Sequence, residues 1–470
     1  PPEPYLTQYQ NDPYSGEAAY VDAELNRLFA DLQKKGWTGK TLMVLTADHG
    51  ESLSEHGELT HSYFAYNSTL HVPLIMAGPG ISAGRVNDYV SHIDIFPTAC
   101  EFLNIKAPEF LQGESLAPLI QGKKAKARPI YFESLDPYLN KGCAPLRGFI
   151  KDQKKYVDSP IPEFYDLAGD FNETANLAAK IDLTPLKNKL REMEKNMASP
   201  MKKETARAAD RQTLEKLRSL GYVASSVAEI KSRYGPEDDI KSVLPFQQRL
   251  ERAIIWADEG KIAESIREMN VLIAEKRDFS PAYTYLAQTL LSQGRTRDAI
   301  RVMDGAVRNI PNNYSLLSAY GTILVQTGQY IRAIEVLEKA LSIIDFDPEP
   351  WDNLGIAYMR EDNYVKALEY FEKAITLDKT FALAYSNLGA VYWSIYSEQG
   401  RKPDDIARSI DNFRQAVALD PTLNLAWRGL GFASAEAGKP DDAIAAWEKA
   451  VITDPSDAFS TYSLGLAYFK

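Results

Sequence analysis

Three of the five histidines of the chain lie in one short stretch, LTADHGESLSEHGELTH. They are His49, His56 and His61, and they stand among carboxylates and glycines. Imidazole nitrogens and carboxylate oxygens bind divalent cations, and imidazole also transfers protons near neutral pH. Residue types alone leave a metal site, a proton-transfer site and a polar loop as alternatives. Asp48 and His49 can reach one cation together if the backbone turns sharply, and Gly50 has no side chain to obstruct such a turn.

The apolar pattern around this stretch predicts the elements that position it. TLMVLTAD, residues 41–48, is a short β-branched run that fits a buried strand, and VPLIMAGPG and RPIYFES are further strand candidates. Ahead of it, apolar residues at helical spacing predict a helix, with Ser15 as N-cap and Gly36 as its stop. Alternating helix and strand indicates an α/β layer fold. This fold places the Asp-His pair at the carboxyl end of a strand, where open α/β sheets expose their sites.

The second half of the chain repeats itself. PEPWDNLGIAYMREDNYVKALEYFEKAITLD and LNLAWRGLGFASAEAGKPDDAIAAWEKAVITDP carry Trp, Leu-Gly and Ala at matching offsets. The pattern resembles the tetratricopeptide repeat, whose period is ~34 residues. It predicts an all-α solenoid over residues 246–470, with about six repeats, a partial one, and an insertion, SIYSEQGRKPDD, in the fifth. We place the starts near these residues: Phe246, Ser280, Tyr314, Pro348, Ala382, Asn424 and, for the partial repeat, Ala458.

Composition excludes several classes of protein. With 470 residues the chain is long enough for at least two domains, and 45% apolar and 25% charged residues are ordinary for globular protein. A net charge of -11 without a basic cluster argues against nucleic acid as a main partner. No apolar run approaches the ~18 residues that cross a bilayer, and PPEPYLTQYQ lacks the blocks of a signal peptide. Cys100 and Cys143 make no disulfide framework.

Several segments of the first half share a family likeness. TADHGESLSEHG, YNSTLHVPLIMAGPG, SHIDIFPTACEFLNI, LQGESLAPLI, RPIYFES and PEFYDLAGDFNETANLA follow one another in the order and spacing seen in sulfatases. The chain thus resembles the C-terminal part of the sulfatase family, within the alkaline-phosphatase-like superfamily. The resemblance implies a partial α/β sulfatase domain over residues 1–182. Residues 183–245 read as a charged helical linker to the repeats.

The resemblance also implies roles for particular residues. It implies that Asp48 and His49 hold one divalent metal ion, together with acids from an upstream segment that also carries a nucleophile, usually formylglycine. Many members have Asn where this chain has His49, and nitrogen ligation leaves Ca²⁺, Mn²⁺ and Zn²⁺ open. His61 stands near the place of a lysine that holds sulfate oxygens, so we expect an anion-binding or acid role for it. His56 is expected to orient the loop or a ligand.

Three other residues match known functional patterns, one as a possible nucleophile and two as possible peptide contacts. Cys143 opens CAPLR, which matches the core Cys-x-Pro-x-Arg of sulfatase activation, but it follows the metal pair and lacks the usual Thr-Gly, so we expect coincidence. Asn353 and Asn387 take equal places in adjacent repeats and are candidates for hydrogen bonds to a bound peptide. The repeats are thus expected to bind a protein or peptide partner.

The function that follows is a metal-dependent hydrolase of sulfate esters carrying a protein-interaction domain. A phosphodiester or phosphonate hydrolase of the same superfamily is one alternative, since these substrates share tetrahedral anionic geometry. A non-catalytic repeat scaffold is the other. Half a metal shell without a nucleophile cannot run the reaction, so residues 1–470 alone are expected to be inactive. The resemblance weakly suggests export to a bacterial envelope.

Overall fold

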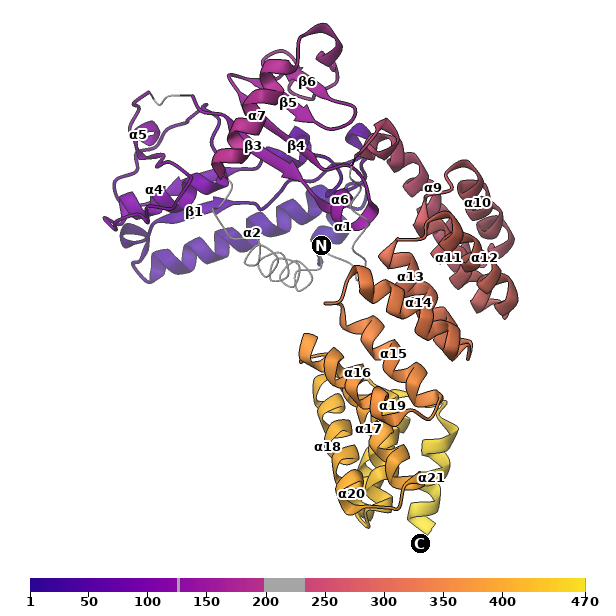
Figure 1. Cartoon of the computed structure of the whole chain (residues 1–470). Coiled ribbons are helices and arrows are strands. Elements are labelled where there is room, and N and C mark those ends of the chain that lie inside the picture. Colours follow the sequence, from indigo (N-terminus) through magenta and orange to yellow (C-terminus); the bar gives the residue numbers. More distant parts are fainter. Residues whose placement is uncertain (125–126, 198–232, 470) are drawn as a thin grey trace. The chain divides into compact units, whose positions relative to one another are not determined.

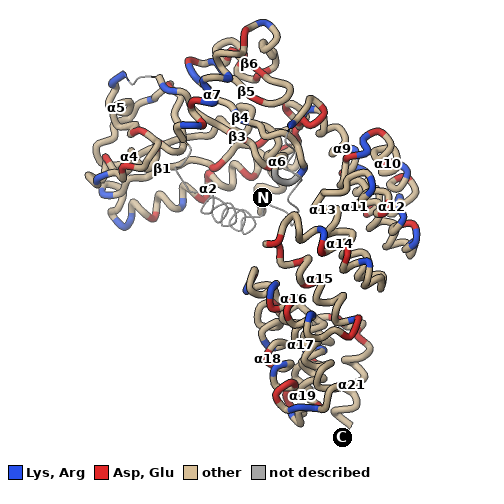
Figure 2. The backbone as a smooth tube through the Cα atoms, viewed as in Figure 1, with Lys and Arg blue, Asp and Glu red and all other residues tan. Residues whose placement is uncertain are grey.

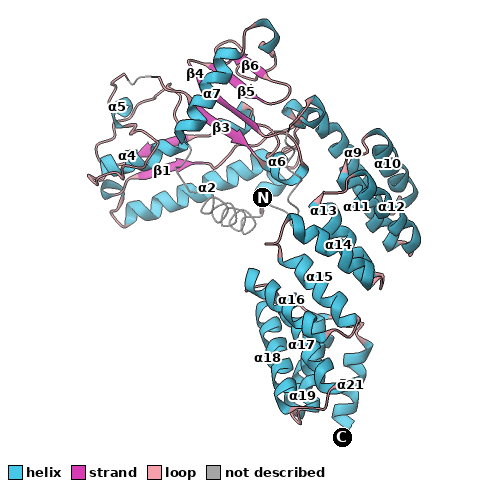
Figure 3. Ribbon diagram, in the orientation of Figure 1, coloured by secondary structure: helices cyan, strands magenta, loops and turns pink. Residues whose placement is uncertain are grey.

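The computed structural model describes residues 1–124, 127–197 and 233–469. The chain forms two compact units, which we describe separately (Figure 1). The first comprises Pro1–Pro137, residues 144–197 and Tyr234–Ile240, and contains small sheets with helices. The second continues from Lys241 and is a run of helices (Figure 3). The expected order, an α/β part followed by an all-α solenoid, is confirmed.

The first unit opens with a long amphipathic helix, α2 (Pro13–Lys34). Asp12 is its N-cap, because the Asp12 carboxylate accepts a hydrogen bond from the backbone nitrogen of Ser15 at 3.2 Å. Pro13 follows at the first helical position, where its missing N–H costs nothing. The expectation that Ser15 caps the helix is therefore wrong. Gly36 ends the helix as expected, with a left-handed φ of 65° that favours glycine.

A two-stranded sheet leads into the histidine-rich stretch. Strand β1 (Met43–Thr46) pairs antiparallel with β2 (Leu74–Ala77), with Val44 opposite Met76. Both lie inside segments predicted to be strands. Because the pairing is antiparallel, the rule for sites at the ends of parallel strands does not apply here. The loop that follows β1 has to place the site by its own contacts.

A four-stranded antiparallel meander forms the second sheet. Its strands are β3 (Ile130–Ser134), β4 (Leu146–Lys151), β5 (Lys154–Asp158) and β6 (Glu163–Asp166), in the order β3-β4-β5-β6. The sequence predicted β3 and missed the other three. Helix α7 (Thr184–Met197) packs its apolar side on this sheet, with Leu190 buried among residues such as Phe149 and Tyr156. The part of the charged stretch 183–245 that the structure describes thus includes a helix docked on the sheet.

Short helices fill the rest of the first unit. Two of them matter for the site: the 3₁₀ turn Glu55–Gly57 within the histidine-rich loop, and α3, which follows that loop. The short α-helices of this unit are α1 (Tyr5–Gln8), α3 (Asn67–Leu70), α4 (Ile95–Phe102) and α5 (Ala117–Ile120). Helix α6 (Asp136–Lys141) begins in the first unit, and its residues from Tyr138 on belong to the second.

The second unit is a series of antiparallel helix pairs. Six expected starts coincide with the first residue of a helix: Ser280, Tyr314, Pro348, Ala382, Asn424 and Ala458. The start expected near Phe246 is off, because α9 begins at Ile240. The helices are α9 (Ile240–Asp258), α10 (Ile262–Glu275), α11 (Ser280–Ser292), α12 (Thr296–Asn309), α13 (Tyr314–Gln326), α14 (Tyr330–Ile343), α15 (Pro348–Arg360), α16 (Tyr364–Leu377), α17 (Ala382–Glu398), α18 (Pro403–Leu419), α19 (Asn424–Glu436), α20 (Pro440–Thr453) and α21 (Ala458–Phe469).

Glycine against a large side chain is a contact that recurs in the helix pairs from α13–α14 to α19–α20. A Cβ at Gly355 would lie 2.5 Å from a ring carbon of Phe371, and one at Gly321 would lie 2.3 Å from a methyl carbon of Leu337. Gly431 faces Trp447 in the same way. The glycines let the two helices approach, while the large residues fill the space between them. Shared offsets of Gly and Ala in the sequence reflect this packing.

The insertion in the fifth repeat lengthens helices instead of forming a loop. Helices α17 and α18 have 17 residues each, whereas α15 has 13 and α16 has 14. Residues of SIYSEQGRKPDD extend the end of α17 and the start of α18. This pair is therefore taller than its neighbours by about one helical turn.

Surface charge and hydropathy agree with the sequence-based exclusions. Figure 2 shows acidic and basic residues interspersed along the helices of each unit. Across residues 1–124, 127–197 and 233–469, no helix combines the length and the apolar character that spanning a bilayer requires.

Candidate functional site

The loop that carries the histidines closes on itself. The backbone nitrogen of Ser52 donates to the carbonyl oxygen of Thr60 at 2.7 Å, which makes the flanking residues Glu51 and His61 neighbours across the loop. The buried carboxylate of Glu58 orders the returning strand, since it accepts hydrogen bonds from the backbone nitrogens of Tyr63 at 2.6 Å and of Phe64 at 3.3 Å. Burial raises the pKa of Glu58.

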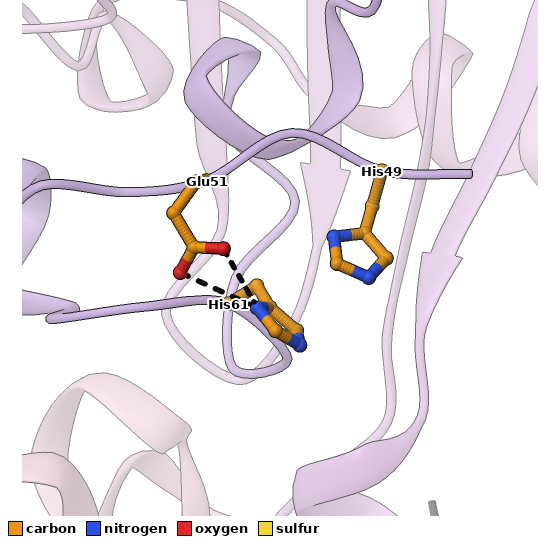
Figure 4. Close-up of side chains that lie close together, drawn as sticks. All are labelled: His49, Glu51 and His61. Atoms are coloured by element: carbon orange, nitrogen blue, oxygen red, sulfur yellow. Dashed lines mark hydrogen bonds and ion pairs between the residues drawn. The ribbon is translucent and has the colours of Figure 1, made fainter. Parts of the chain in front are cut away.

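Three side chains converge where this loop meets the end of β1. One potential ligand atom from each of His49, Glu51 and His61 lies within 4.8 Å of the other two. Figure 4 shows the two rings and the carboxylate meeting from two backbone segments. The Nδ1 atom of His61 is 3.1 Å from Oε2 of Glu51, and the centroids of the two imidazole rings are 4.1 Å apart.

The hydrogen bonds indicate which nitrogen of each ring carries the proton. Nδ1 of His49 is 2.8 Å from the carbonyl oxygen of Gly50, and because a carbonyl only accepts, Nδ1 carries the proton. Nε2 of His49 then presents its lone pair. Nδ1 of His61 donates to the Glu51 carboxylate in the same manner, which leaves Nε2 of His61 as the outward nitrogen.

Asp48 joins this group through His49. Its Oδ2 lies 3.7 Å from Nε2 of His49, and its side chain is 80% exposed. The hydrogen bond from the backbone nitrogen of His49 to Oδ1, 3.0 Å long, lowers the pKa of Asp48 and favours the carboxylate. The two residues expected to bind a metal therefore face the same space.

The donor atoms fit a divalent cation that is intermediate between hard and soft in its choice of ligands. Zinc bonds of about 2.0–2.2 Å place neighbouring ligand atoms roughly 3–3.5 Å apart, close to the 3.7 Å between Asp48 and His49. Two imidazoles with one or two carboxylates suit Zn²⁺ or Mn²⁺ better than Ca²⁺, which prefers an all-oxygen shell. The described residues thus offer donor types that suit a divalent cation.

Gly50 is required by a close approach of backbone, not by the turn expected from the sequence. A Cβ at this position would lie 2.2 Å from the carbonyl oxygen of Ser68. The Gly50 nitrogen donates to the carbonyl oxygen of Thr69 at 2.8 Å. Any side chain here would push the loop away from α3 and would move His49 and Glu51 with it.

The remaining histidines lie elsewhere in the first unit. His56 stacks on Tyr66, with ring centroids 3.6 Å apart, and its Nε2 donates to the carbonyl oxygen of Asn172 at 3.1 Å. Its contacts orient the loop. The ring of His71 meets Phe171 edge-on, and His92 lies 3.3 Å from the Thr46 hydroxyl.

Cys143 and the two repeat asparagines are engaged in contacts within the protein. Cys143 is fully buried. The amide nitrogen of Asn353 donates to the Thr322 hydroxyl at 3.0 Å, and that of Asn387 donates to the Asp352 carboxylate at 3.0 Å. Each bond joins a helix to the corresponding helix of the preceding repeat.

Glu51 is the site residue that sequence reasoning did not single out. It lies inside the stretch that drew attention, yet its partner His61 is ten residues away, and only the closed loop brings them together. The signal available in the sequence was the pair of glycines, Gly50 and Gly57, which allow such a compact loop.

Comparisons with known proteins match this division of the chain. Residues 3–105 match the model of the sulfatase family, and residues 286–348, 348–381, 404–460 and 428–470 match models of the tetratricopeptide repeat. The chain thus has a sulfatase-family domain match near its start and tetratricopeptide repeats from residue 286 on.

Particular relatives resemble the first part. Arylsulfatase K of Bos taurus is 33% identical over 180 residues, which are 36% of this chain and 33% of that protein. Delta 4,5-hexuronate-2-O-sulfatase of Bacteroides thetaiotaomicron is 32% identical over 166 residues, 34% of each. This chain spans about a third of the length of these relatives. Among solved structures, a chain of the APC/C hetero-tetramer Cut9-Hcn1 is similar to this chain, with 20% identity and a TM-score of 0.40. The match covers 47% of this chain and 42% of that one.

Proposed function

We propose that the protein is a metal-dependent hydrolase of sulfate esters in which Asp48 and His49 hold one divalent cation. The observation that carries the proposal is the convergence of the Asp48 carboxylate and Nε2 of His49, 3.7 Å apart, within a segment of sulfatase-family sequence. Hydrolase chemistry follows from the family, whereas the substrate and the metal are part of the proposal.

The chain's own residues prepare this site for an anionic ester. A bound cation supplies Lewis acidity that neutralises the anionic oxygens of the substrate. The Gly50 carbonyl fixes the ring of His49 with Nε2 toward the cation. His61 presents Nε2 to the same space and, when protonated, donates a hydrogen bond to a substrate oxygen or a proton to the leaving group. The Glu51 carboxylate orients this ring by accepting the hydrogen bond from Nδ1.

The nucleophile and the other metal ligands are expected from sequence upstream of residue 1. The family resemblance points to a formylglycine there. Turnover is therefore expected of the full-length protein, and no turnover of residues 1–470 alone. This part of the proposal follows from the resemblance and not from the geometry of the described residues.

The repeats are proposed to bind a protein partner, as tetratricopeptide repeats commonly do. Asn353 and Asn387 are weaker candidates for peptide contacts than the sequence suggested. Their amide nitrogens already bridge neighbouring repeats, so a peptide would have to share or displace those bonds.

Turnover by the full-length protein tests the proposal. We expect hydrolysis of an aryl sulfate that depends on added Zn²⁺ or Mn²⁺ and that falls at least a hundredfold in Asp48→Ala. Unchanged activity in Asp48→Ala would remove the metal assignment. Faster hydrolysis of an aryl phosphodiester would favour the alternative substrate class. Absence of activity on both substrates, with metal supplied, would favour the non-catalytic scaffold.

A further inference from the structure

The turn after β6 holds the segment that carries the cluster. Glu173, 1% exposed, accepts a hydrogen bond at Oε2 from the backbone nitrogen of Asn67, 2.5 Å away. The Asn67 side chain donates to the carbonyl oxygen of Phe171 at 2.8 Å. His56 donates to the carbonyl oxygen of the intervening residue, Asn172. Three consecutive residues of one turn thus bind two places along the 49–70 segment.

A buried lysine makes this arrangement possible. Lys155, in the middle of β5, is fully buried and forms an ion pair with Glu173. Its ammonium also lies over the rings of Phe132, at 5.1 Å from the centroid, and of Tyr66, at 5.7 Å. A buried carboxylate is very costly without a counter-charge, so Glu173 can remain in this position because Lys155 accompanies it. Burial lowers the pKa of Lys155, and the nearby Glu173 opposes that effect.

Two routes connect the pair to the cluster. Along the first, Glu173 fixes Asn67 at the start of α3, and the carbonyl oxygens of Ser68 and Thr69 hold Gly50, which lies between His49 and Glu51. The route is short and made of backbone contacts. It therefore transmits a displacement of the turn to the cluster with little room for relaxation.

The second route runs through aromatic packing. Tyr66 stacks on His56, and its hydroxyl donates to Oε1 of Glu163 on β6 at 2.8 Å. His56 belongs to the loop that closes between Glu51 and His61. Glu163 of the four-stranded sheet therefore holds Tyr66, and Tyr66 contacts the middle of the histidine-rich loop at His56.

The backbone of Glu173 indicates that contacts, not local preference, set its position. Its φ is 57°, a left-handed value that is uncommon outside glycine and asparagine and costs on the order of 1 kcal/mol. Such a conformation persists where surrounding interactions enforce it. Here those interactions are the ion pair with Lys155 and the hydrogen bond from Asn67.

We propose that Lys155 and Glu173 are positioning residues for the His49–Glu51–His61 cluster. They act through α3 and the His56 loop, without contacting the substrate. The inference rests on the proposed function, because a fixed geometry of the cluster matters only if the cluster binds a ligand. The placement itself is measurable without turnover.

The test compares single and double substitutions in the whole chain. Lys155→Met and Glu173→Gln each leave one buried charge uncompensated, whereas the double variant removes both charges and keeps an acceptor for Asn67. We expect each single variant to bind Zn²⁺ at least tenfold more weakly, with altered imidazole NMR signals of His49 and His61. The double variant should recover to within about threefold of the wild-type affinity.

Lys154→Met is the matched control. Lys154 precedes Lys155 on the same strand and pairs with Asp166 at the surface, with a side chain 46% exposed. Its loss should change neither the Zn²⁺ affinity nor the imidazole signals. Single variants that fold, by circular dichroism, and keep wild-type signals and affinity would overturn the inference. If the single variants do not fold, His56→Phe, which keeps the stack on Tyr66, takes their place, and unchanged signals there would overturn it too.

The proposed function can fail independently. A wild-type chain that binds no Zn²⁺, while the imidazole signals still move in Lys155→Met and Glu173→Gln, would contradict the metal assignment and support the positioning role. Zn²⁺ binding that needs Asp48 but does not change in Lys155→Met or Glu173→Gln would support the metal assignment and contradict the positioning role.

Discussion

The imidazole rings of His49 and His61 lie face to face at an angle of 32°, with their centroids 4.1 Å apart. Each ring donates its Nδ1 proton away from the other, to the Gly50 carbonyl and to the Glu51 carboxylate. The two Nδ1 bonds therefore set the orientation of both rings before any ligand is present.

Metal selectivity follows from this donor set. We expect the chain to bind Zn²⁺ at least tenfold more tightly than Ca²⁺, because imidazole is a poor ligand for calcium. His49→Ala should lower the Zn²⁺ affinity at least tenfold, and Glu51→Gln should lower it less. Isothermal titration calorimetry measures both effects. His71→Ala, which removes an exposed histidine outside the cluster, should bind Zn²⁺ like the wild type. Equal loss in His71→Ala would point to non-specific binding.

Gly50 should tolerate no side chain. In Gly50→Ala the added carbon meets the Ser68 carbonyl oxygen, so we expect a loss of about 1–3 kcal/mol in local stability and faster amide hydrogen exchange over residues 45–70. Gly84→Ala is the control, since a Cβ there has no neighbour within 4 Å. Exchange rates in Gly50→Ala equal to those of Gly84→Ala would contradict the close approach.

The effect of a glycine-to-alanine substitution on the stability of the repeats should depend on which atoms lie opposite the glycine. Gly355→Ala drives a methyl group against Phe371, and we expect the free energy of unfolding to fall by about 1–3 kcal/mol. Gly305→Ala lies inside α12 with open space around it, and the higher helix propensity of alanine should raise stability by about 1 kcal/mol. Urea unfolding monitored by circular dichroism measures both changes. The same sign for the two substitutions would rule out the packing explanation.

Asp352 should make the repeats more stable in mild acid. Burial, and to a smaller degree Glu349, raises the pKa of Asp352 from 3.8 to about 7, although the Asn387 amide opposes the shift. The folded state therefore holds the proton more tightly than the unfolded chain. The free energy of unfolding should fall as the pH rises from about 4 through 7, by at most about 4 kcal/mol from this residue.

Asp352→Asn tests this dependence. It removes the titrating group and keeps an oxygen acceptor for Asn387, so most of the difference between urea midpoints at pH 5 and pH 8 should disappear. Asp411→Asn, an exposed change on α18, should leave the difference in place. A pH dependence that survives in Asp352→Asn would assign it to other groups.

Six of the seven repeat starts were predictable to the residue because their signals are local. Pro348, Ala382 and Asn424 begin helices where the sequence repeats, since each repeat folds mainly against its neighbours. The tall pair α17–α18 was expected as an insertion but not as longer helices, because a run such as SIYSEQGRKPDD has no apolar period to indicate its conformation.

The first unit was harder to predict because its contacts are distant in sequence. Strands β4 to β6 were missed for another reason: they pair through short turns, and their short mixed sequences carry little periodicity. Asp48 and His49 were identified from a family likeness, and Glu51 emerged only from the closed loop. The sequence gives no reason to connect Lys155 with Glu173, because charged residues are usually exposed and nothing in the sequence indicates that these two are buried.

The taller α17–α18 pair has a consequence for recognition. A perfectly regular array offers the same surface at every step, so a bound chain can shift by one unit at little cost. One pair that stands about a turn above the others removes this translational degeneracy. A ligand that touches it can dock in a single register.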